Sequence, residues 1–119
     1  MSASSPNRLL RGTLDVLLLK TLSWGPLHGY AVSRSIRLTS GDDLKVDEGA
    51  LYPALRRLEG KGYLASYWAL TDQQREARFY ELTPEGRRQL DLEVTEWNRY
   101  VAAMARVLRA DGPRLAEES

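Results

Sequence analysis

The side chains with the clearest chemical potential lie in one segment, residues 48–62, which reads EGALYPALRRLEGKG. Its leucines stand at positions 51, 55 and 58, and this spacing predicts an amphipathic helix with a buried stripe. The opposite face of that helix carries small, aromatic and basic residues: Gly49, Tyr52, Pro53, Arg56 and Arg57. Arginine can bond a phosphate or a guanine, tyrosine can contact a phosphate or a thymine methyl, and glycine permits close approach. This face therefore suits the major groove of DNA, although it equally fits a solvated, salt-bridged helix surface.

Few other residues of the 119-residue chain could carry chemistry. The sequence has no cysteine and one histidine, which excludes disulfides and thiolate metal sites. It also lacks a glycine-rich phosphate loop after a strand and a pair of carboxylates in a plausible cleft. We therefore expect a protein that is not an enzyme and that uses no cofactor and no metal.

Composition and charge indicate a single domain. Hydrophobic residues make up 43% of the chain and charged residues 28%, which are ordinary values for a soluble protein. The sequence has no apolar block long enough for a signal peptide or a membrane span, so we expect a cytoplasmic protein with no membrane partner. The net charge is +1, so any positive charge that serves nucleic-acid binding must be local.

Three helices are expected before residue 62. The first begins near Leu9 and places leucines 10, 14, 17, 18 and 22 on one face, and the second runs from His28 to about Leu38. A short strand at 44–46 precedes the third helix, residues 48–60, for which Asp47 is the expected N-cap. Pro53 falls in the second turn of this helix, where it removes a hydrogen bond and crowds the carbonyl of Gly49. We therefore expect the start of the third helix to be loosened or bent.

The pattern then changes to that of a β-hairpin followed by a long helix. Residues 63–70 and 77–82 suit strands, and the polar segment 71–76 suits the tip between them. Thr83 and Pro84 open a last helix that continues to about Ala110. This order predicts a mainly α fold with a small β-hairpin, namely a winged helix-turn-helix domain plus a long C-terminal dimerisation helix. We divide the chain into a disordered tail (1–8), the winged helix-turn-helix DNA-binding domain (9–83), the dimerisation helix (84–110) and a flexible tail (111–119).

The hairpin, or wing, carries further candidates for DNA binding. Arg75 and Arg78 are placed to enter a minor groove, and the alternative is an exposed hairpin whose charges neutralise one another. Three apolar residues are expected to pack the wing onto the helices: Trp68, Phe79 and Leu82. At the start of the second helix, Tyr30 is either a phosphate contact or a half-buried core residue, and His28 is more simply a cap.

The last helix presents a heptad seam formed by Leu90, Val94, Trp97, Val101, Met104 and Leu108. The other predicted elements cannot cover a helix of this length, and an exposed seam would promote aggregation. We therefore expect a second copy to cover it in a twofold dimer. The partner's first helix, near Leu10, Leu14 and Leu17, is expected to join this interface. Trp97 then either packs in the dimer core or lines a pocket for a flat aromatic ligand.

Three stretches resemble the PadR family of bacterial transcription regulators: LHGYAV at 27–32, EGALYPALRRLEGKGYL at 48–64 and ARFYELTPEGRRQL at 77–90. The single C-terminal helix resembles the short branch of that family. The resemblance implies a repressor that binds an inverted repeat in double-stranded DNA as a homodimer, often with release by a small aromatic or lipophilic effector. By position it assigns DNA contacts to Gly49, Tyr52, Pro53 and Arg56 and to Arg75 and Arg78 of the wing, with Tyr80 at the wing's base. The alternative is a winged-helix protein-interaction module without operator binding, which salt-insensitive binding would reveal.

Overall fold

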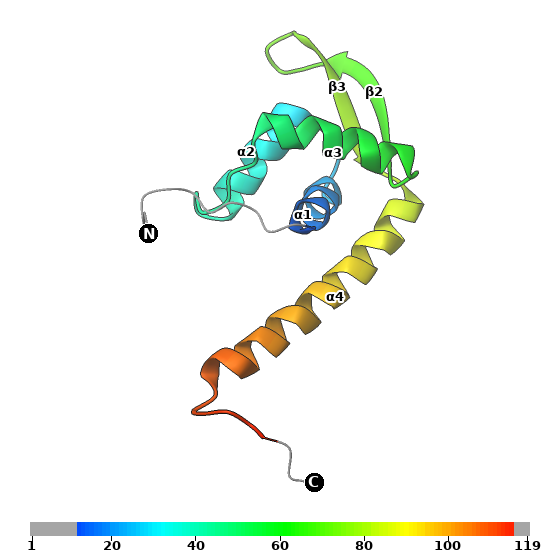
Figure 1. Ribbon diagram of the computed structural model, residues 1–119. Helices are drawn as coiled ribbons and strands as arrows, with labels where there is room; N and C mark the ends of the chain where they lie inside the picture. The colour runs from blue at the N-terminus through cyan, green and yellow to red at the C-terminus, as the bar shows by residue number, and fades with distance from the viewer. Residues whose placement is uncertain (1–11, 116–119) are drawn as a thin grey trace.

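The computed structural model describes residues 12–115 and shows four helices and a small three-stranded sheet. The helices are α1 (Thr13–Leu22), α2 (Gly29–Thr39), α3 (Glu48–Gly60) and α4 (Pro84–Arg109). The strands are β1 (Leu27–His28), β2 (Leu64–Leu70) and β3 (Glu76–Leu82). In Figure 1, α3 passes over α1, the hairpin β2–β3 projects beyond α3, and α4 extends away from the other helices. The predicted N-terminal tail and Leu10 lie outside the described residues, as do the last four residues of the predicted C-terminal tail.

The core forms where α1, α2 and α3 pack against the sheet. Its largest fully buried side chains are Leu18, Leu19, Leu22, Val32, Leu51, Leu55 and Leu58. All three leucines predicted to form the buried stripe of α3 belong to this set. Burial of a leucine stabilises the folded state by about 1.5–3 kcal/mol, so this cluster holds α3 firmly against the other helices.

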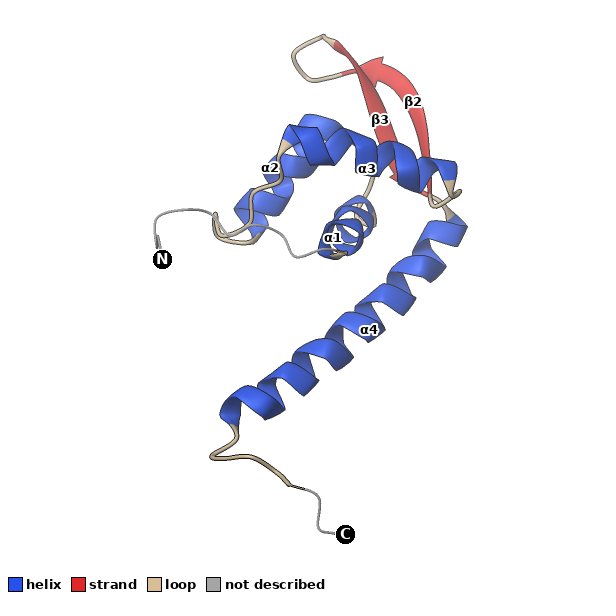
Figure 2. Ribbon diagram, viewed as in Figure 1, coloured by secondary structure: helices blue, strands red, loops and turns tan. Residues whose placement is uncertain are grey.

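The sheet contains one strand that the sequence pattern does not predict. Its order is β1-β3-β2, with antiparallel pairing throughout, and the two residues of β1 lie opposite Tyr80 and Phe79 of β3. Figure 2 shows the two long strands in red beside the end of α3. The prediction of a short strand at 44–46 is wrong, because only Leu44 has a strand-type backbone pairing there.

Helix α3 has the predicted bounds, and Pro53 lies inside it. Asp47 precedes the helix in an extended conformation, and its carbonyl accepts from Ala50 N–H at 3.0 Å and Leu51 N–H at 2.9 Å. The Asp47 side chain makes no capping hydrogen bond. The helix ends where Gly62 takes a φ of 84° and Tyr63 N–H donates to Leu58 O at 3.0 Å, a glycine-dependent helix stop.

Thr83 joins the end of α3 to the start of α4. Its hydroxyl donates to Gly62 O at 2.6 Å and accepts from Gly86 N–H at 2.9 Å, so one side chain caps α4 and bonds the stop of α3. Thr83 N–H donates to Tyr63 O at 3.1 Å. A Cβ on Gly86 would lie 2.1 Å from that same carbonyl oxygen, so only glycine fits there. These contacts fix the direction of α4 relative to α3.

Candidate DNA-binding surface

The outer side of α3 presents Gly49, Pro53 and Arg56, all of which are exposed. They follow one another at intervals of three to four residues, so they lie along one face of the helix. The leucine stripe on the other side is buried, which turns this face to solvent. The structure therefore places three of the five residues predicted on this face side by side and accessible to a partner.

Tyr52 lies between this outer face and the core. It is half-buried, and its ring lies over Gly29 at the start of α2, where an added Cβ would be 2.5 Å from Cε1 of the ring. The ring therefore joins α2 to α3 and is only partly free to contact DNA. As a DNA contact, Tyr52 stays a prediction.

Arg57 is drawn away from the outer face by an ion pair. Its guanidinium donates to the carboxylate of Asp15 on α1, and the Asp15 side chain is only 21% exposed. A hydrogen bond between charged groups stabilises the folded state more than one between neutral groups does, so this pair holds α3 against α1. As a DNA contact Arg57 stays a prediction, and the ion pair counts against it.

Arg78 on β3 is held by a polar chain that begins on α3. The Ser66 hydroxyl on β2 donates to Glu59 Oε2 at 2.6 Å, and Arg78 Nε donates to the Ser66 hydroxyl oxygen at 3.0 Å. The Arg78 guanidinium also lies 3.8 Å from Glu59 Oε2. The wing is therefore fixed to α3 by side-chain hydrogen bonds as well as by its apolar base.

Arg56 and Arg78 line the same hollow, of about 440 Å³, together with Glu59, Gly60 and Tyr80. Two arginines from two different elements thus border one concave surface between α3 and the wing. The carboxylate of Glu59 offsets part of their positive charge. It also accepts a hydrogen bond from the Ser66 hydroxyl, which in turn accepts one from Arg78. A phosphate group is the natural ligand for such a pair of arginines.

Tyr80 forms the base of this hollow. Only 3% of its surface is exposed, and burial raises the pKa of its phenol above the ordinary value of about 10, an effect that the charge of Arg78 partly offsets. Direct contact between Tyr80 and a base edge stays a prediction, and the burial of the residue favours a supporting role.

The tip of the wing is a tight turn that presents Arg75. Gln74 has a φ of 64°, and backbone bonds from Thr71 N–H to Arg75 O (2.8 Å) and from Gln74 N–H to Thr71 O (2.9 Å) close the turn. Arg75 is exposed, and its side chain makes no ion pair with any residue in the described range 12–115. It is therefore the wing arginine that is most available to a phosphate.

Helix α2 adds basic residues that the sequence reading missed. Arg34 and Arg37 stand three residues apart on α2 and line a hollow of about 340 Å³ with Lys45 and Tyr30. Arg37 pairs with Asp42 at 3.1 Å, whereas Tyr30 is exposed and stacks on His28 at 6.5 Å. His28 is the N-cap of α2, as expected, because its Nδ1 accepts from Ala31 N–H. The spacing of Arg34 and Arg37 was the available signal for this basic edge.

The face of α4 predicted to form a dimer divides into two parts. Leu90 is 5% exposed and belongs to the core of its own chain, so as a dimer contact it stays a prediction, and this burial counts against it. Val94 is half-buried against that core. The rest of the seam is exposed: Trp97, Val101, Met104 and Leu108. On α1, Leu14 and Leu17 are half-buried at the edge of the core.

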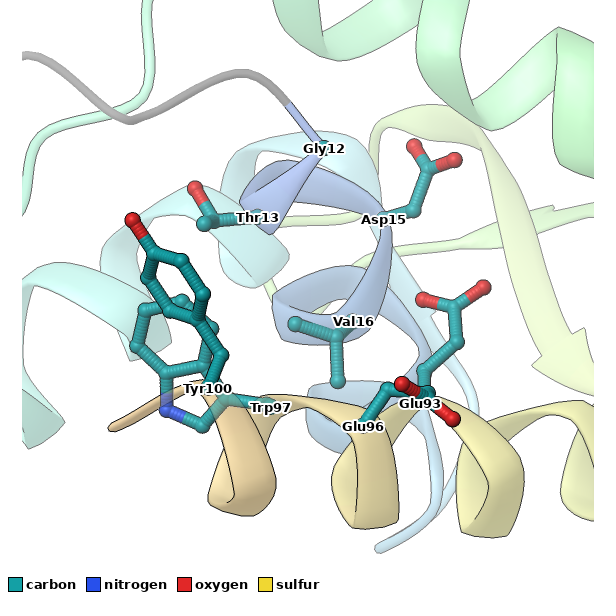
Figure 3. A pocket seen from close by; sticks show the side chains of 8 residues that line it. All are labelled: Gly12, Thr13, Asp15, Val16, Glu93, Glu96, Trp97 and Tyr100. Carbon is teal, nitrogen blue, oxygen red and sulfur yellow. The ribbon is translucent and has the colours of Figure 1, made fainter. Parts of the chain in front are cut away.

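Trp97 borders a hollow of about 620 Å³ between α1 and α4 (Figure 3). The rings of Trp97 and Tyr100, with centroids 5.8 Å apart, lie on one side of Val16. On the other side lie three carboxylates, those of Asp15, Glu93 and Glu96. The hollow is therefore aromatic at one end and acidic at the other.

No helix within the described part of the chain is long and apolar enough to cross a membrane.

Comparison with known proteins agrees with this geometry. The model of the transcriptional regulator PadR-like family matches residues 18–92. A transcriptional regulator from Clostridium thermocellum has a similar structure, with a TM-score of 0.73 and 30% identity over 81% of this chain and 93% of that one. The structure of a PadR family transcriptional regulator from Eggerthella lenta is also similar, with a TM-score of 0.71. The two proteins are 33% identical over 85% of this chain and 86% of that one. An uncharacterised protein from Lysinibacillus sphaericus is 27% identical over 75% of this chain and 82% of its own length.

These matches confirm the predicted winged-helix fold with its long C-terminal helix. PadR-like proteins are DNA-binding regulators of transcription and not enzymes. The family model covers both α3 and the hairpin β2–β3, as well as the core that positions them. The chain therefore belongs to the PadR-like family of transcriptional regulators.

Proposed function

We propose that this protein is a homodimeric repressor that binds an inverted-repeat operator, with α3 in the major groove and the wing at the adjacent minor groove. The observation that carries the proposal is the shared hollow of Arg56 on α3 and Arg78 on β3. Two arginines from the two elements border one concave surface, and the phosphate backbone of a groove edge would satisfy both. Arg75 at the wing tip and Arg34 on α2 are further exposed arginines that would contact phosphates in such a complex.

A dimer is proposed because α4 leaves an apolar strip exposed beyond the core. Val101, Met104 and Leu108 lie along one side of the helix, and water contact with such a strip is unfavourable. A twofold arrangement would cover both strips and would present two copies of α3. Recognition helices about 34 Å apart then meet successive major grooves on one side of the duplex.

Repression is the regulatory outcome that we favour. A dimer that occupies a promoter would exclude RNA polymerase without any further contact. We also propose that an aromatic or lipophilic effector weakens DNA binding by entering the hollow beside Trp97. Quenching of tryptophan fluorescence by a panel of flat aromatic compounds tests this proposal, with loss of the response in Trp97→Phe as the expected result. No quenching across the panel would contradict it.

The DNA-binding part of the proposal is tested by gel shift on the fragment immediately upstream of the gene for this chain. Arg56→Ala is expected to weaken binding about tenfold or more, because an arginine contact to a base or phosphate is lost. Arg88→Ala is the matched control, since it also removes one exposed positive charge but lies on α4, where it pairs with Glu85. Equal affinities for these two variants would contradict the assignment of α3 as the recognition helix.

The dimer is tested separately by sedimentation equilibrium. Val101→Glu places a charge in the exposed strip and is expected to yield monomers. Leu92→Glu is the control, because Leu92 is also exposed on α4 but lies on the side away from the strip. A monomeric wild-type protein, or an unchanged dimer in Val101→Glu, would exclude this interface.

A further inference from the structure

Trp68 on β2 is exposed in a way that packing does not explain. The sequence pattern predicts that it packs the wing onto the helices, yet 63% of its surface is exposed. Phe79 and Leu82, for which the same prediction was made, are at least half-buried. The ring of Trp68 is therefore accessible to a partner.

The strand register shows which side of the wing carries this ring. Side chains alternate along β2, so Ser66 and Trp68 share one face and Tyr67 points to the other. Ser66 donates to Glu59 of α3, which identifies its face as the one toward the recognition helix. Tyr67 stacks on Phe79 at 5.8 Å on the opposite face. Trp68 therefore stands on the same side as α3 and its arginines.

A chain of contacts anchored on α3 holds the ring in place. Trp68 lies directly opposite Arg78 in the register, and the Arg78 guanidinium lies 5.8 Å from the centroid of the ring. Arg78 in turn bonds Ser66, and Ser66 bonds Glu59. The ring is thus oriented by side chains from both strands of the wing and from the recognition helix. Preorganisation of this kind lowers the entropy lost when a partner binds.

We propose that Trp68 is a direct DNA contact of the wing, with its ring packed on the deoxyribose edge of the minor groove, and that Ser66 is its positioning residue. This inference rests on the proposed function. DNA is the occupant that the neighbouring charges favour, because Arg78 and Arg56 border the adjoining hollow and would face phosphates. An apolar ring adds contact area with the sugars that the arginines do not supply.

The first test measures binding to a short duplex selected by the wild-type protein from a random library. Trp68→Ala is expected to bind about tenfold more weakly, in the range of one aromatic contact to nucleic acid. The dependence of affinity on salt should not change, because the ring carries no charge. Trp24→Ala is the matched control: Trp24 is 62% exposed, and its ring lies beside Lys20 of α1 and not beside an arginine of the wing. It is expected to bind as the wild type does.

The positioning role of Ser66 is tested by a double-mutant cycle. Ser66→Ala removes the bonds to Glu59 and Arg78 without changing the charge, and it is expected to weaken binding by less than Trp68→Ala does. If Ser66 acts through the ring, the double variant should bind no more weakly than Trp68→Ala alone. Additive losses would overturn the positioning role.

Tryptophan fluorescence gives a readout that a change in stability alone would not produce. Addition of the selected duplex is expected to change the emission of the wild type and of Trp24→Phe, and to leave that of Trp68→Phe nearly unchanged. Wild-type affinity in Trp68→Ala, or a full fluorescence response in Trp68→Phe, would overturn this inference and leave the proposed function intact. A wild-type protein that selects no duplex at low salt would overturn both.

Discussion

The ring of Tyr52 on α3 lies against Gly29 at the first position of α2, where a single added Cβ would come within 2.5 Å of the ring. This contact sets how closely the two helices of the helix-turn-helix approach each other. It also explains why a tyrosine expected on the outer face of α3 is half-buried instead. The position of α3 against α2 is therefore set by one of its own half-buried residues.

We predict that Gly29→Ala lowers the free energy of unfolding by about 1–3 kcal/mol, because the new methyl group must displace the Tyr52 ring. Urea unfolding measures the loss. Gly49→Ala is the control within α3: nothing lies within 4 Å of its Cβ position, so the substitution should be neutral or stabilise the helix by up to about 1 kcal/mol. Equal changes in the free energy of unfolding for the two variants would show that the contact between Gly29 and Tyr52 does not limit stability.

The local features of the fold were predictable from the sequence because each depends on residues close together in the chain. The leucine spacing in 48–60 predicted α3 with its observed bounds, and Thr83 and Pro84 marked the start of α4. The two residues of β1 are too few to show any periodicity, so this strand was missed. The strand predicted at 44–46 was wrong, because Leu44 alone finds a backbone partner there.

The candidate site was less predictable, because contacts between distant segments of the chain determine where its arginine side chains lie. Arg57 pairs with Asp15 on α1, and Arg78 is held by Glu59 and Ser66. Neither pair follows from spacing along one helix or strand. Leu90 continues the heptad pattern of α4 yet lies in the core of its own chain, since α4 packs on α1 and β3.

Pro53 offers a test that separates folding from recognition. Pro53→Ala restores an N–H that can donate to the Gly49 carbonyl and removes the ring from that turn, so it should stabilise the protein by up to about 3 kcal/mol. The exposed proline ring is lost at the same time, and we expect weaker binding to operator DNA. Urea unfolding and gel shift on the same preparation measure the two effects. Unchanged operator affinity and selectivity would remove Pro53 from the contact surface.

We predict that Gly86 tolerates substitution by alanine far less well than Gly60 does. An added Cβ would lie 2.1 Å from the backbone oxygen of Tyr63, and backbone cannot move aside as a side-chain tip can. Gly86→Ala should therefore lower the free energy of unfolding by about 3 kcal/mol or more. Gly60→Ala is the control, because nothing lies within 4 Å of its Cβ position. Thermal unfolding of both variants measures the contrast, and equal midpoints would contradict the close approach.

Tyr80 gives the fold a dependence on alkaline pH. Its phenol has a raised pKa because it is buried, so the folded state retains a proton that the unfolded state loses near pH 10. The stabilising contribution of Tyr80 is complete below pH 10 and falls as the pH rises from there through the folded-state pKa. Urea unfolding across this range should show a decline in the wild type that is smaller in Tyr80→Phe. Parallel declines in the two proteins would contradict this origin.

The proposed function requires that α3 and the wing form a charged surface for the DNA backbone. The most direct measurement is the affinity for the upstream fragment at several salt concentrations, for the wild type and for Arg56→Ala. We predict a steep linear fall of log K with log salt in the wild type, and a weaker complex in Arg56→Ala whose slope is smaller by about 1 if Arg56 bonds a phosphate. Binding that does not respond to salt, or identical behaviour of the two proteins, would contradict the account.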